Sequence, residues 1–281
     1  MSLVVTVVPG RPPVVVDSTS ALIRADDMGV LRGDGVFETT LVVEGVPRDL
    51  EEHLARMAVS AGMVELDLPA AEAWQDAIRA VLAVGSPQPQ ASLRLVATRG
   101  PESGGDPTCF ATLSPVAAST LAQRDGVSIL LLDRGFAGPE AAKAPWLLAG
   151  AKTLSYAVNM AAQRYAKANG AGDVIFVGSD GAILEGPTAT VLLANGRTLT
   201  TPPGDGILAG ITVRRLYAAA SRAGWNVREA VLTPADLGAA EGIWLTSSVR
   251  LLAPVVAIDG IARAVGPQQA ELARLLQVPG A

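Results

Sequence analysis

Short apolar runs separated by glycine- and proline-containing turns most strongly constrain how this chain can fold. The longest of these runs, such as Val127–Leu132, are far shorter than the ~20 residues that a membrane-spanning helix requires. Runs of this length are typical of buried strands, and the longer stretches with apolar residues every three or four positions are typical of helices. The 281 residues suffice for one large domain or two compact ones.

The order of these segments predicts a mixed α+β protein with two lobes, in which antiparallel and mixed sheets are flanked by helices. The expected strands cover residues 3–8, 35–45, 91–98, 108–114, 127–132, 173–177, 182–185, 188–193, 198–200, 242–246 and 254–258. Hairpin turns are expected at Glu44-Gly45 and at Asn195-Gly196. The expected helices cover residues 50–61, 70–84, 155–168, 211–222 and 268–276. Residues 135–146 are expected to be irregular, and the small, polar stretch 115–123 is the candidate connector. The predicted domains are therefore residues 1–116 and 117–281.

The charge pattern favours small molecules as partners. The formal net charge is −5, and acidic and basic residues are interleaved, which gives no electrostatic footprint for nucleic acid or for an anionic membrane. The apolar stretch near the start of the chain has no basic segment before it and is therefore expected to be a strand, not a signal peptide. These features predict a soluble, cytoplasmic protein.

One cysteine, Cys109, and one histidine, His53, restrict the possible chemistry. They exclude an internal disulfide and any metal site built from histidine and cysteine clusters, so we expect no metal. A nucleophilic hydrolase would have to use His53, which lies in a helical-looking stretch, and the chain has no G-x-S-x-G motif.

Lysine is rare in this chain and is therefore informative. Of the 22 basic residues only Lys143, Lys152 and Lys167 are lysines. Arginine cannot replace lysine in imine chemistry, because a guanidinium stays protonated and is not an amine nucleophile. Lys143 beside a proline and Lys167 near a helix end have ordinary explanations. Lys152, among small residues just before a predicted helix, is either a surface lysine or a reactive one.

Two other features are compatible with cofactor binding and also with a purely structural role. Gly206–Arg215 places a glycine-flanked turn and Thr212 at the start of a helix, where free backbone N–H groups can bind phosphate. Alternatively, Thr212 caps its own helix. Glu185 ends an apolar strand, where its carboxylate either meets a protonated pyridine nitrogen or lies exposed at the strand end.

Seven motifs in a fixed order resemble the class IV aminotransferase family, which consists of fold type IV enzymes dependent on pyridoxal-5'-phosphate (PLP). The motifs are Arg-Gly-Asp-Gly-Val-Phe-Glu at 32–38, His-Leu-Ala-Arg at 53–56, Thr-Arg-Gly at 98–100, Lys152, Asp-Gly-x-x-x-Glu at 180–185, Gly-Ile-Thr at 210–212, and Thr-Ser-Ser with Pro-Val at 246–255. The resemblance therefore extends from about residue 26 to residue 260.

The resemblance implies a role for each matching residue. Lys152 would bind PLP as a Schiff base and act as the catalytic residue, and Glu185 would pair with the pyridine nitrogen. The residues implied to hold the phosphate are Arg56, Ile211, Thr212, and Ser247 or Ser248. Members of the family are typically homodimers, so we expect a homodimer here.

Within the family the chain is most similar to aminodeoxychorismate lyases, which form 4-aminobenzoate for folate synthesis. The Arg-x-His carboxylate trap of D-amino-acid aminotransferases is absent after Thr98-Arg-Gly. Arg32 stands where aminotransferases usually have tyrosine. Aminodeoxychorismate carries two carboxylates, which Arg32 and Arg250 can bind as guanidinium clamps, with Phe37 and Thr39 also predicted at the substrate.

Two alternatives stay open at this point. The first is an aminotransferase that acts on D-amino acids or branched-chain L-amino acids, because the motif residues keep the same roles in both reactions. The second is a non-catalytic binding protein that retains the fold, against which the intact Lys152, Glu185 and Arg56 argue.

Overall fold

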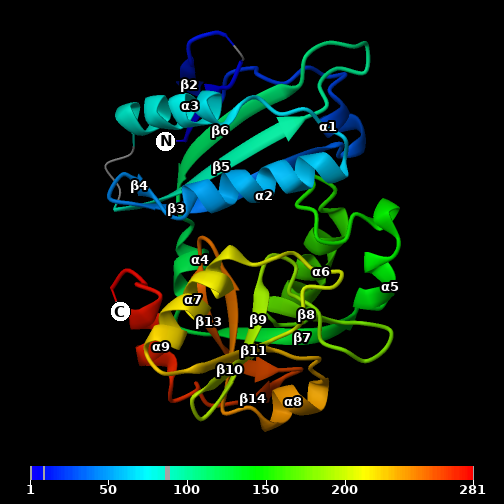
Figure 1. Ribbon diagram of the computed structural model, residues 1–281, viewed down its shortest axis with the longest axis vertical. Coiled ribbons are helices and arrows are strands. Elements are labelled where there is room, and N and C mark those ends of the chain that lie inside the picture. The colour runs from blue at the N-terminus through cyan, green and yellow to red at the C-terminus, as the bar shows by residue number, and fades with distance from the viewer. Residues whose placement is uncertain (1, 9, 86–88, 281) are drawn as a thin grey trace. The chain divides into compact units, whose positions relative to one another are not determined.

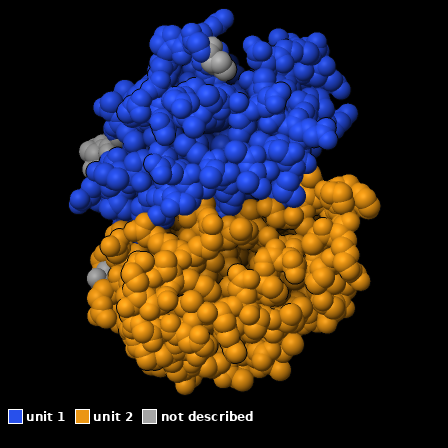
Figure 2. All heavy atoms as spheres, in the orientation of Figure 1, with its two compact units in different colours: residues 1–117, 151–156 blue, residues 118–150, 157–281 orange. Residues whose placement is uncertain are grey.

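The computed structural model describes residues 2–8, 10–85 and 89–280. By its internal contacts the chain divides into two compact units (Figure 2): unit 1 is Met1–Ala117 with Ala151–Tyr156, and unit 2 is Ala118–Gly150 with Ala157–Ala281. The sequence placed Lys152 in the second lobe, whereas its contacts group it with unit 1. The reason is backbone pairing, because the Phe37 N–H donates to the Lys152 carbonyl at 3.0 Å and the Leu154 N–H donates to the Gly35 carbonyl at 2.8 Å.

Unit 1 contains an antiparallel sheet (Figure 1). Its strands in spatial order are β2 (Val15–Asp17), β1 (Leu3–Thr6), β6 (Thr108–Pro115), β5 (Gln90–Thr98), β3 (Gly35–Val43) and β4 (Val46–Pro47). The register of the long central pair aligns Gly35 with Thr98 and Val43 with Gln90. The turn between β3 and β4 is made by Glu44 and Gly45, both with positive φ, as the sequence predicts.

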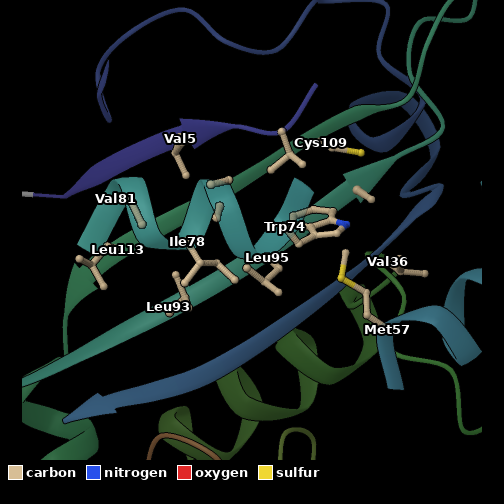
Figure 3. Close-up of a cluster of buried hydrophobic side chains, with 14 of the residues drawn as sticks. Val5, Val36, Met57, Trp74, Ile78, Val81, Leu93, Leu95, Cys109 and Leu113 are labelled. Atoms are coloured by element: carbon tan, nitrogen blue, oxygen red, sulfur yellow. The ribbon is translucent and has the colours of Figure 1, made fainter. Parts of the chain in front are cut away.

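Helices of unit 1 cover its sheet and close the core. They are α1 (Met28–Arg32), α2 (Leu50–Met63) and α3 (Ala71–Val84), and α2 contacts β3 while α3 contacts β1 and β6. Figure 3 shows the ring of Trp74 from α3 in the same cluster as Met57 from α2 and Leu95 from β5. These side chains are almost completely buried, so this cluster is the main source of apolar burial in unit 1.

Unit 2 contains a mixed sheet, again as predicted (Figure 1). The parallel pairs are β10 with β11, β13 with β7, and β7 with β8. In spatial order the strands are β11 (Asn226–Glu229), β10 (Thr198–Thr201), β9 (Thr190–Asn195), β12 (Gly242–Ser247), β13 (Leu251–Ile258), β7 (Val127–Asp133) and β8 (Asp173–Val177), and β14 (Ile261–Ala262) pairs with β13.

The long helices of unit 2 lie close to their predicted limits. The predicted helix 211–222 is observed with these limits as α7 (Ile211–Arg222), while α6 (Ala157–Ala168) starts two residues later than expected. The other helical segments are α4 (Ala118–Ala122), α5 (Gly138–Ala142), the 3-10 turn Pro145–Leu147, α8 (Pro234–Ala239) and α9 (Gln269–Leu275).

The boundary between the two units, at Ala117 and Ala118, lies within the expected connector 115–123, which also contains α4. Two local predictions were wrong. The stretch 135–146, expected to be irregular, contains α5. The expected strand 182–185 is not a regular strand: it follows β8 through two hydrogen bonds, from the Phe176 N–H to the Glu185 carbonyl and from the Leu184 N–H to the Phe176 carbonyl, both 2.9 Å. A segment of four or five residues is too short for its hydrophobic periodicity to distinguish a helix, a strand and an irregular segment.

None of the helices in the described ranges combines the length and the apolar character that crossing a bilayer requires.

Trp74 offers a direct test of the unit 1 core. The Trp74→Ala variant removes a side chain that is 1% exposed, so we expect it to lower the free energy of unfolding by about 3–5 kcal/mol. Urea unfolding followed by circular dichroism measures this change. The control is Trp146→Ala, because Trp146 is 78% exposed and its loss should change stability by less than about 0.5 kcal/mol. Equal effects of the two variants would contradict this description of the core.

Candidate active site

Glycine residues at the start of β3 allow another part of unit 1 to approach it closely. Gly33 ends α1 in the left-handed conformation with φ 68°. A Cβ atom on Gly35 would lie 2.4 Å from the Ala97 carbonyl oxygen and 2.8 Å from Leu154 Cδ1. A side chain at residue 35 would therefore clash with the backbone of the neighbouring strand β5 and would also crowd the Leu154 side chain. Between the two glycines, Asp34 accepts a hydrogen bond of 2.6 Å from Arg99 Nε, which explains why the 32–38 and 98–100 motifs occur together.

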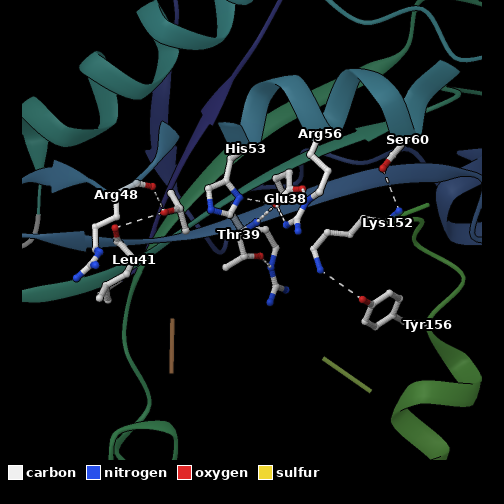
Figure 4. Close-up of polar contacts among 11 residues, drawn as sticks. Glu38, Thr39, Leu41, Arg48, His53, Arg56, Ser60, Lys152 and Tyr156 are labelled. Carbon is white, nitrogen blue, oxygen red and sulfur yellow. Dashed lines mark hydrogen bonds and ion pairs between the residues drawn. The ribbon is translucent and has the colours of Figure 1, made fainter. Parts of the chain in front are cut away.

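Contacts hold both the backbone and the side chain of Lys152. Its backbone N–H donates to Ser60 Oγ of α2 at 3.0 Å. Its Nζ atom donates to the Tyr156 hydroxyl at 3.3 Å (Figure 4). The same Nζ atom lies 4.4 Å from the centroid of the Phe37 ring. The rings of Phe37 and Tyr156 pack edge to face at 5.0 Å. The structure thus holds a half-buried amine in one position, next to aromatic rings.

A buried carboxylate, Glu38, binds two basic side chains of α2 (Figure 4). Its Oε1 accepts from Arg56 Nε at 2.6 Å, and its Oε2 lies 2.9 Å from Arg56 Nη2 and 2.6 Å from His53 Nδ1. Burial by itself raises the pKa of Glu38, but the hydrogen bonds from His53 and Arg56 outweigh burial and lower the pKa to about 2. Glu38 is therefore ionised at neutral pH and holds Arg56 through two of its nitrogens.

The sequence predicted Arg56 but not its partners Glu38 and His53. A signal was present, because Glu38 stands within a largely apolar strand, where a buried carboxylate is costly unless it is paired. His53 and Arg56 are three residues apart and so lie on the same helix face. That a single carboxylate would bind both could not be read from this spacing.

The opposite face of β3 carries other residues that were singled out. Phe37 and Thr39 alternate with Glu38 along the strand and therefore project to the other side of the sheet. Arg94 of β5 pairs with Thr39 in register, donates from Nε to Thr39 Oγ1 at 3.4 Å, and has its Cζ 5.7 Å from the Phe37 ring centroid. Sequence reasoning missed Arg94, which is exposed on the face that carries Phe37. The predicted Arg32 is exposed in α1.

In unit 2, Glu185 is tied to the segment that leads into α7. Its Oε2 accepts from the Leu208 N–H at 3.1 Å, and its backbone carbonyl is bound by β8. Both ends of the residue are therefore fixed. The Glu185 side chain is half-buried, and a positively charged ring nitrogen would be a favourable partner for a carboxylate in this position.

The first turn of α7 fits an anion. The N-cap residue of α7 is Gly210, which has no side chain to accept a hydrogen bond from the first N–H groups of the helix. Thr212 is the second residue of the helix and is therefore not its cap. A Cβ atom on Gly210 would lie 2.4 Å from Thr190 Oγ1, and Thr190 pairs in register with Thr246 at the end of β12. The N–H groups of Ile211 and Thr212 are thus close to the end of β12, and the helix dipole favours negative charge there.

Ser247 and Ser248 follow Thr246 at the turn between β12 and β13. The predicted substrate ligand Arg250, in the same turn, is only 4% exposed. Its Nη1 donates to Asp173 Oδ2 at 2.7 Å and to Gln123 Oε1 at 2.9 Å. The structure thus gives this guanidinium a carboxylate of the chain itself.

Comparison with known proteins agrees with this arrangement. The family model for amino-transferase class IV matches residues 35–258. The chain belongs to the class IV aminotransferase family. A curated relative from Mycobacterium tuberculosis, named bifunctional aminodeoxychorismate lyase / D-amino acid transaminase, is 44% identical over 250 residues, which is 85% of this chain and 86% of the relative.

Solved structures of other class IV aminotransferases have the same fold. The PLP-bound form of a hypothetical aminotransferase from Mycobacterium tuberculosis is 40% identical, with a TM-score of 0.93 over 98% of this chain and 97% of that chain. A fold IV-transaminase from Curtobacterium pusillum is 39% identical, with a TM-score of 0.91 over the same shares of both chains. The predicted fold type IV is therefore confirmed.

This class IV aminotransferase is a PLP-dependent enzyme with lyase or transaminase activity. The residues described above fit the cofactor: unit 1 offers a positioned amine, and unit 2 offers a fixed carboxylate and a helix N-terminus whose cap is a glycine.

Glu38 generates a pH-dependent prediction. The folded pKa of Glu38, about 2, lies below its ordinary value of 4.5, so its contribution to stability is present above pH 4.5 and is lost as the pH falls through about 2. Glu38→Gln should cost about 3–5 kcal/mol at pH 7, because it removes the charge from a buried ion pair.

The measurement compares urea unfolding of the wild type and Glu38→Gln at pH 7, 5 and 3.5. We expect the difference between them to shrink below about pH 4.5. Glu52→Gln is the control, because Glu52 is exposed on α2, the helix that carries His53 and Arg56. A difference that stayed constant over this range would contradict the role of the Glu38 charge.

Proposed function

We propose that this enzyme is a 4-amino-4-deoxychorismate lyase, which releases pyruvate from its substrate and forms 4-aminobenzoate. The observation that most supports this proposal is the positioned amine of Lys152 in a chain that is 44% identical to a relative named for that activity. The lack of an Arg-x-His segment after residues 98–100 and the presence of Arg32 also favour a lyase.

Each residue has a proposed role toward the cofactor. Lys152 would hold PLP covalently through its amine, and the carboxylate of Glu185 would bind the ring nitrogen and keep it protonated. When bound, PLP withdraws electrons from the substrate carbon that carries nitrogen. The residues proposed to bind the phosphate, as donors or positive charges, are Arg56, Ile211, Thr212, Ser247 and Ser248.

Lys152 is also the proposed proton carrier. The uncharged amine of Lys152 would take the proton from the substrate carbon that bears nitrogen. The Tyr156 hydroxyl, 3.3 Å from Nζ, orients this amine, and the Phe37 ring covers it from another direction. Lys152 would return this proton to the enolpyruvyl group, which leaves as pyruvate, and the aromatic ring that remains would supply the driving force.

Arginines of unit 1 are suited to the two substrate carboxylates. Arg32 and Arg94 are both exposed, and Arg94 lies beside the Phe37 ring that Lys152 also contacts. We propose that Arg94 binds one carboxylate near the reacting amine and that Arg32 binds the other, with Phe37 and Thr39 lining the substrate.

D-amino acid transamination is the second candidate. The 44% identical relative is named for both activities, and a transaminase would use the same proton carrier. Residues around Lys152 therefore do not discriminate between the two reactions, and the enzyme is a candidate for both.

Three further parts of the sequence prediction are kept as proposals: a cytoplasmic location, a homodimer, and a supply of 4-aminobenzoate for folate synthesis. Size-exclusion chromatography with light scattering tests the homodimer, for which the expected mass is twice the 28.7 kDa of the chain.

A paired assay tests the proposed activity. We expect the purified enzyme to convert aminodeoxychorismate to pyruvate and 4-aminobenzoate in equal amounts. D-alanine with 2-oxoglutarate and a branched-chain L-amino acid with the same acceptor measure the transaminase alternatives. Amino-group transfer without any 4-aminobenzoate would overturn the lyase proposal.

Arg94 provides the sharper structural prediction. Arg94→Met should raise KM for aminodeoxychorismate and lower kcat/KM about tenfold to a hundredfold, because a charge-assisted hydrogen bond contributes about 1.5–3 kcal/mol. Arg32→Ala should act in the same direction. Arg79→Ala is the control, since Arg79 is an exposed arginine of α3 with 69% of its side chain accessible. An unchanged KM in both test variants would contradict this role.

A further inference from the structure

We propose that Arg124 and the Arg250–Asp173 ion pair are positioning residues that hold the phosphate-binding turn of unit 2. The turn, Ser248–Arg250, connects β12 to β13, whose register pairs Ser247 with Leu251. The inference rests on the proposed phosphate roles of Ser247 and Ser248 and assigns a function to residues that need not touch the cofactor.

The turn lies where a phosphate bound to α7 would lie. Thr190 packs closely against Gly210, just before the first turn of α7: a Cβ atom on Gly210 would lie 2.4 Å from Thr190 Oγ1. In the sheet, Thr190 pairs in register with Thr246 of β12. Ser247 and Ser248 are the next residues after Thr246. Donors from α7 and from the turn are therefore brought together within unit 2, and the orientation of the turn decides whether its donors point toward the same anion.

Arg124 holds the turn by its backbone. Its Nη2 donates to the Val249 carbonyl at 2.9 Å, and its Nε donates to the Arg250 carbonyl at 3.0 Å. A planar guanidinium that binds two successive carbonyls fixes two successive peptide planes. The N–H of a trans peptide points opposite to its C=O. The same contacts therefore also fix the direction of the N–H groups of Arg250 and Leu251, which belong to these two peptide groups.

Arg250 ties the same turn to β8. Its buried guanidinium pairs with Asp173, the first residue of β8, and with Gln123, the neighbour of Arg124. Asp173 also accepts from the Val174 N–H at 2.9 Å, so its carboxylate is itself fixed. Removing one partner of a buried pair is strongly destabilising. Residues 123–124, 173 and 249–250 thus form one connected set of charged and polar contacts.

The backbone at the turn is strained and needs such support. Leu251, directly after it, has φ 68°, a left-handed conformation that leucine rarely adopts, and its side chain is 2% exposed. Conformations of this kind persist only where surrounding contacts impose them. Loss of the Arg124 contacts should therefore let the turn relax and misdirect its donors.

Pyridoxal and PLP together separate positioning from a general structural role. Both carry the aldehyde that reacts with lysine, but only PLP carries the phosphate. For the apoenzyme we expect Arg124→Met to weaken PLP binding about tenfold, measured by absorbance titration, while pyridoxal binding changes less than about twofold. Arg124→Lys keeps the positive charge but can bind only through a single nitrogen, so it should change the ratio of the PLP and pyridoxal dissociation constants in the same direction by a smaller factor. This variant serves as the test if Arg124→Met does not fold.

Arg263 is a matched control within unit 2. It is also partly buried and donates to two backbone carbonyls, of Leu237 at 2.9 Å and of Ala240 at 2.7 Å. Burial lowers the pKa of both Arg124 and Arg263. Arg263→Met should therefore cost stability and leave the ratio of the PLP and pyridoxal dissociation constants unchanged.

The double variant Ser247→Ala, Ser248→Ala tests the phosphate site itself and should weaken PLP binding selectively. If it does so while Arg124→Met and Arg124→Lys leave the ratio unchanged, the positioning inference is overturned and the phosphate assignment stands. If neither change affects the ratio, both are overturned. Because these titrations need no turnover, a negative lyase assay does not bear on them.

Discussion

The pairing of residues 152–154 with the start of β3 is the constraint on which the candidate active site depends. In this pairing the Leu154 N–H donates to the Gly35 carbonyl and the Phe37 N–H donates to the Lys152 carbonyl, while the glycine at residue 35 leaves room for the backbone of β5 and for the Leu154 side chain. This pairing sets the backbone at Lys152, and the amine is then placed against Phe37 and Tyr156. A lysine on a mobile loop would spread its amine over many positions, and catalysis by a positioned group would be lost.

Pairs of arginine and carboxylate anchor the other functional segments in the same way. Glu38 holds Arg56, Asp34 holds Arg99, and Asp173 holds Arg250. In each case the carboxylate fixes where the guanidinium lies, and two of the three pairs are buried. Burial makes them costly to break, which keeps the segments in place without enlarging the apolar core.

Much of the fold and the chemical class could be predicted from the sequence, because both depend on local patterns. The strand at β3, the helices α2, α3 and α7, and the hairpin at Asn195-Gly196 follow from periodicity and turn residues. The scarcity of lysine singled out Lys152, and the order of the motifs indicated the family and its cofactor.

The parts that could not be predicted depend on contacts between distant segments. Arg94 became visible as a candidate only when the register of β3 and β5 placed it opposite Thr39. Arg250 has the sequence position of a substrate ligand, but its partner Asp173 is 77 residues away. The grouping of Lys152 with unit 1 likewise depends on backbone pairing that no local pattern encodes.

The claim that the amine of Lys152 binds the cofactor aldehyde is tested most directly by chemical trapping. The holoenzyme is reduced with borohydride, digested with trypsin and mapped by mass spectrometry. Our account predicts a single pyridoxyl-phosphate label on Lys152, in the peptide that spans residues 144–164, because a modified lysine is not cleaved. A label on Lys143 or Lys167, or no label in a sample that contains the cofactor, would contradict it.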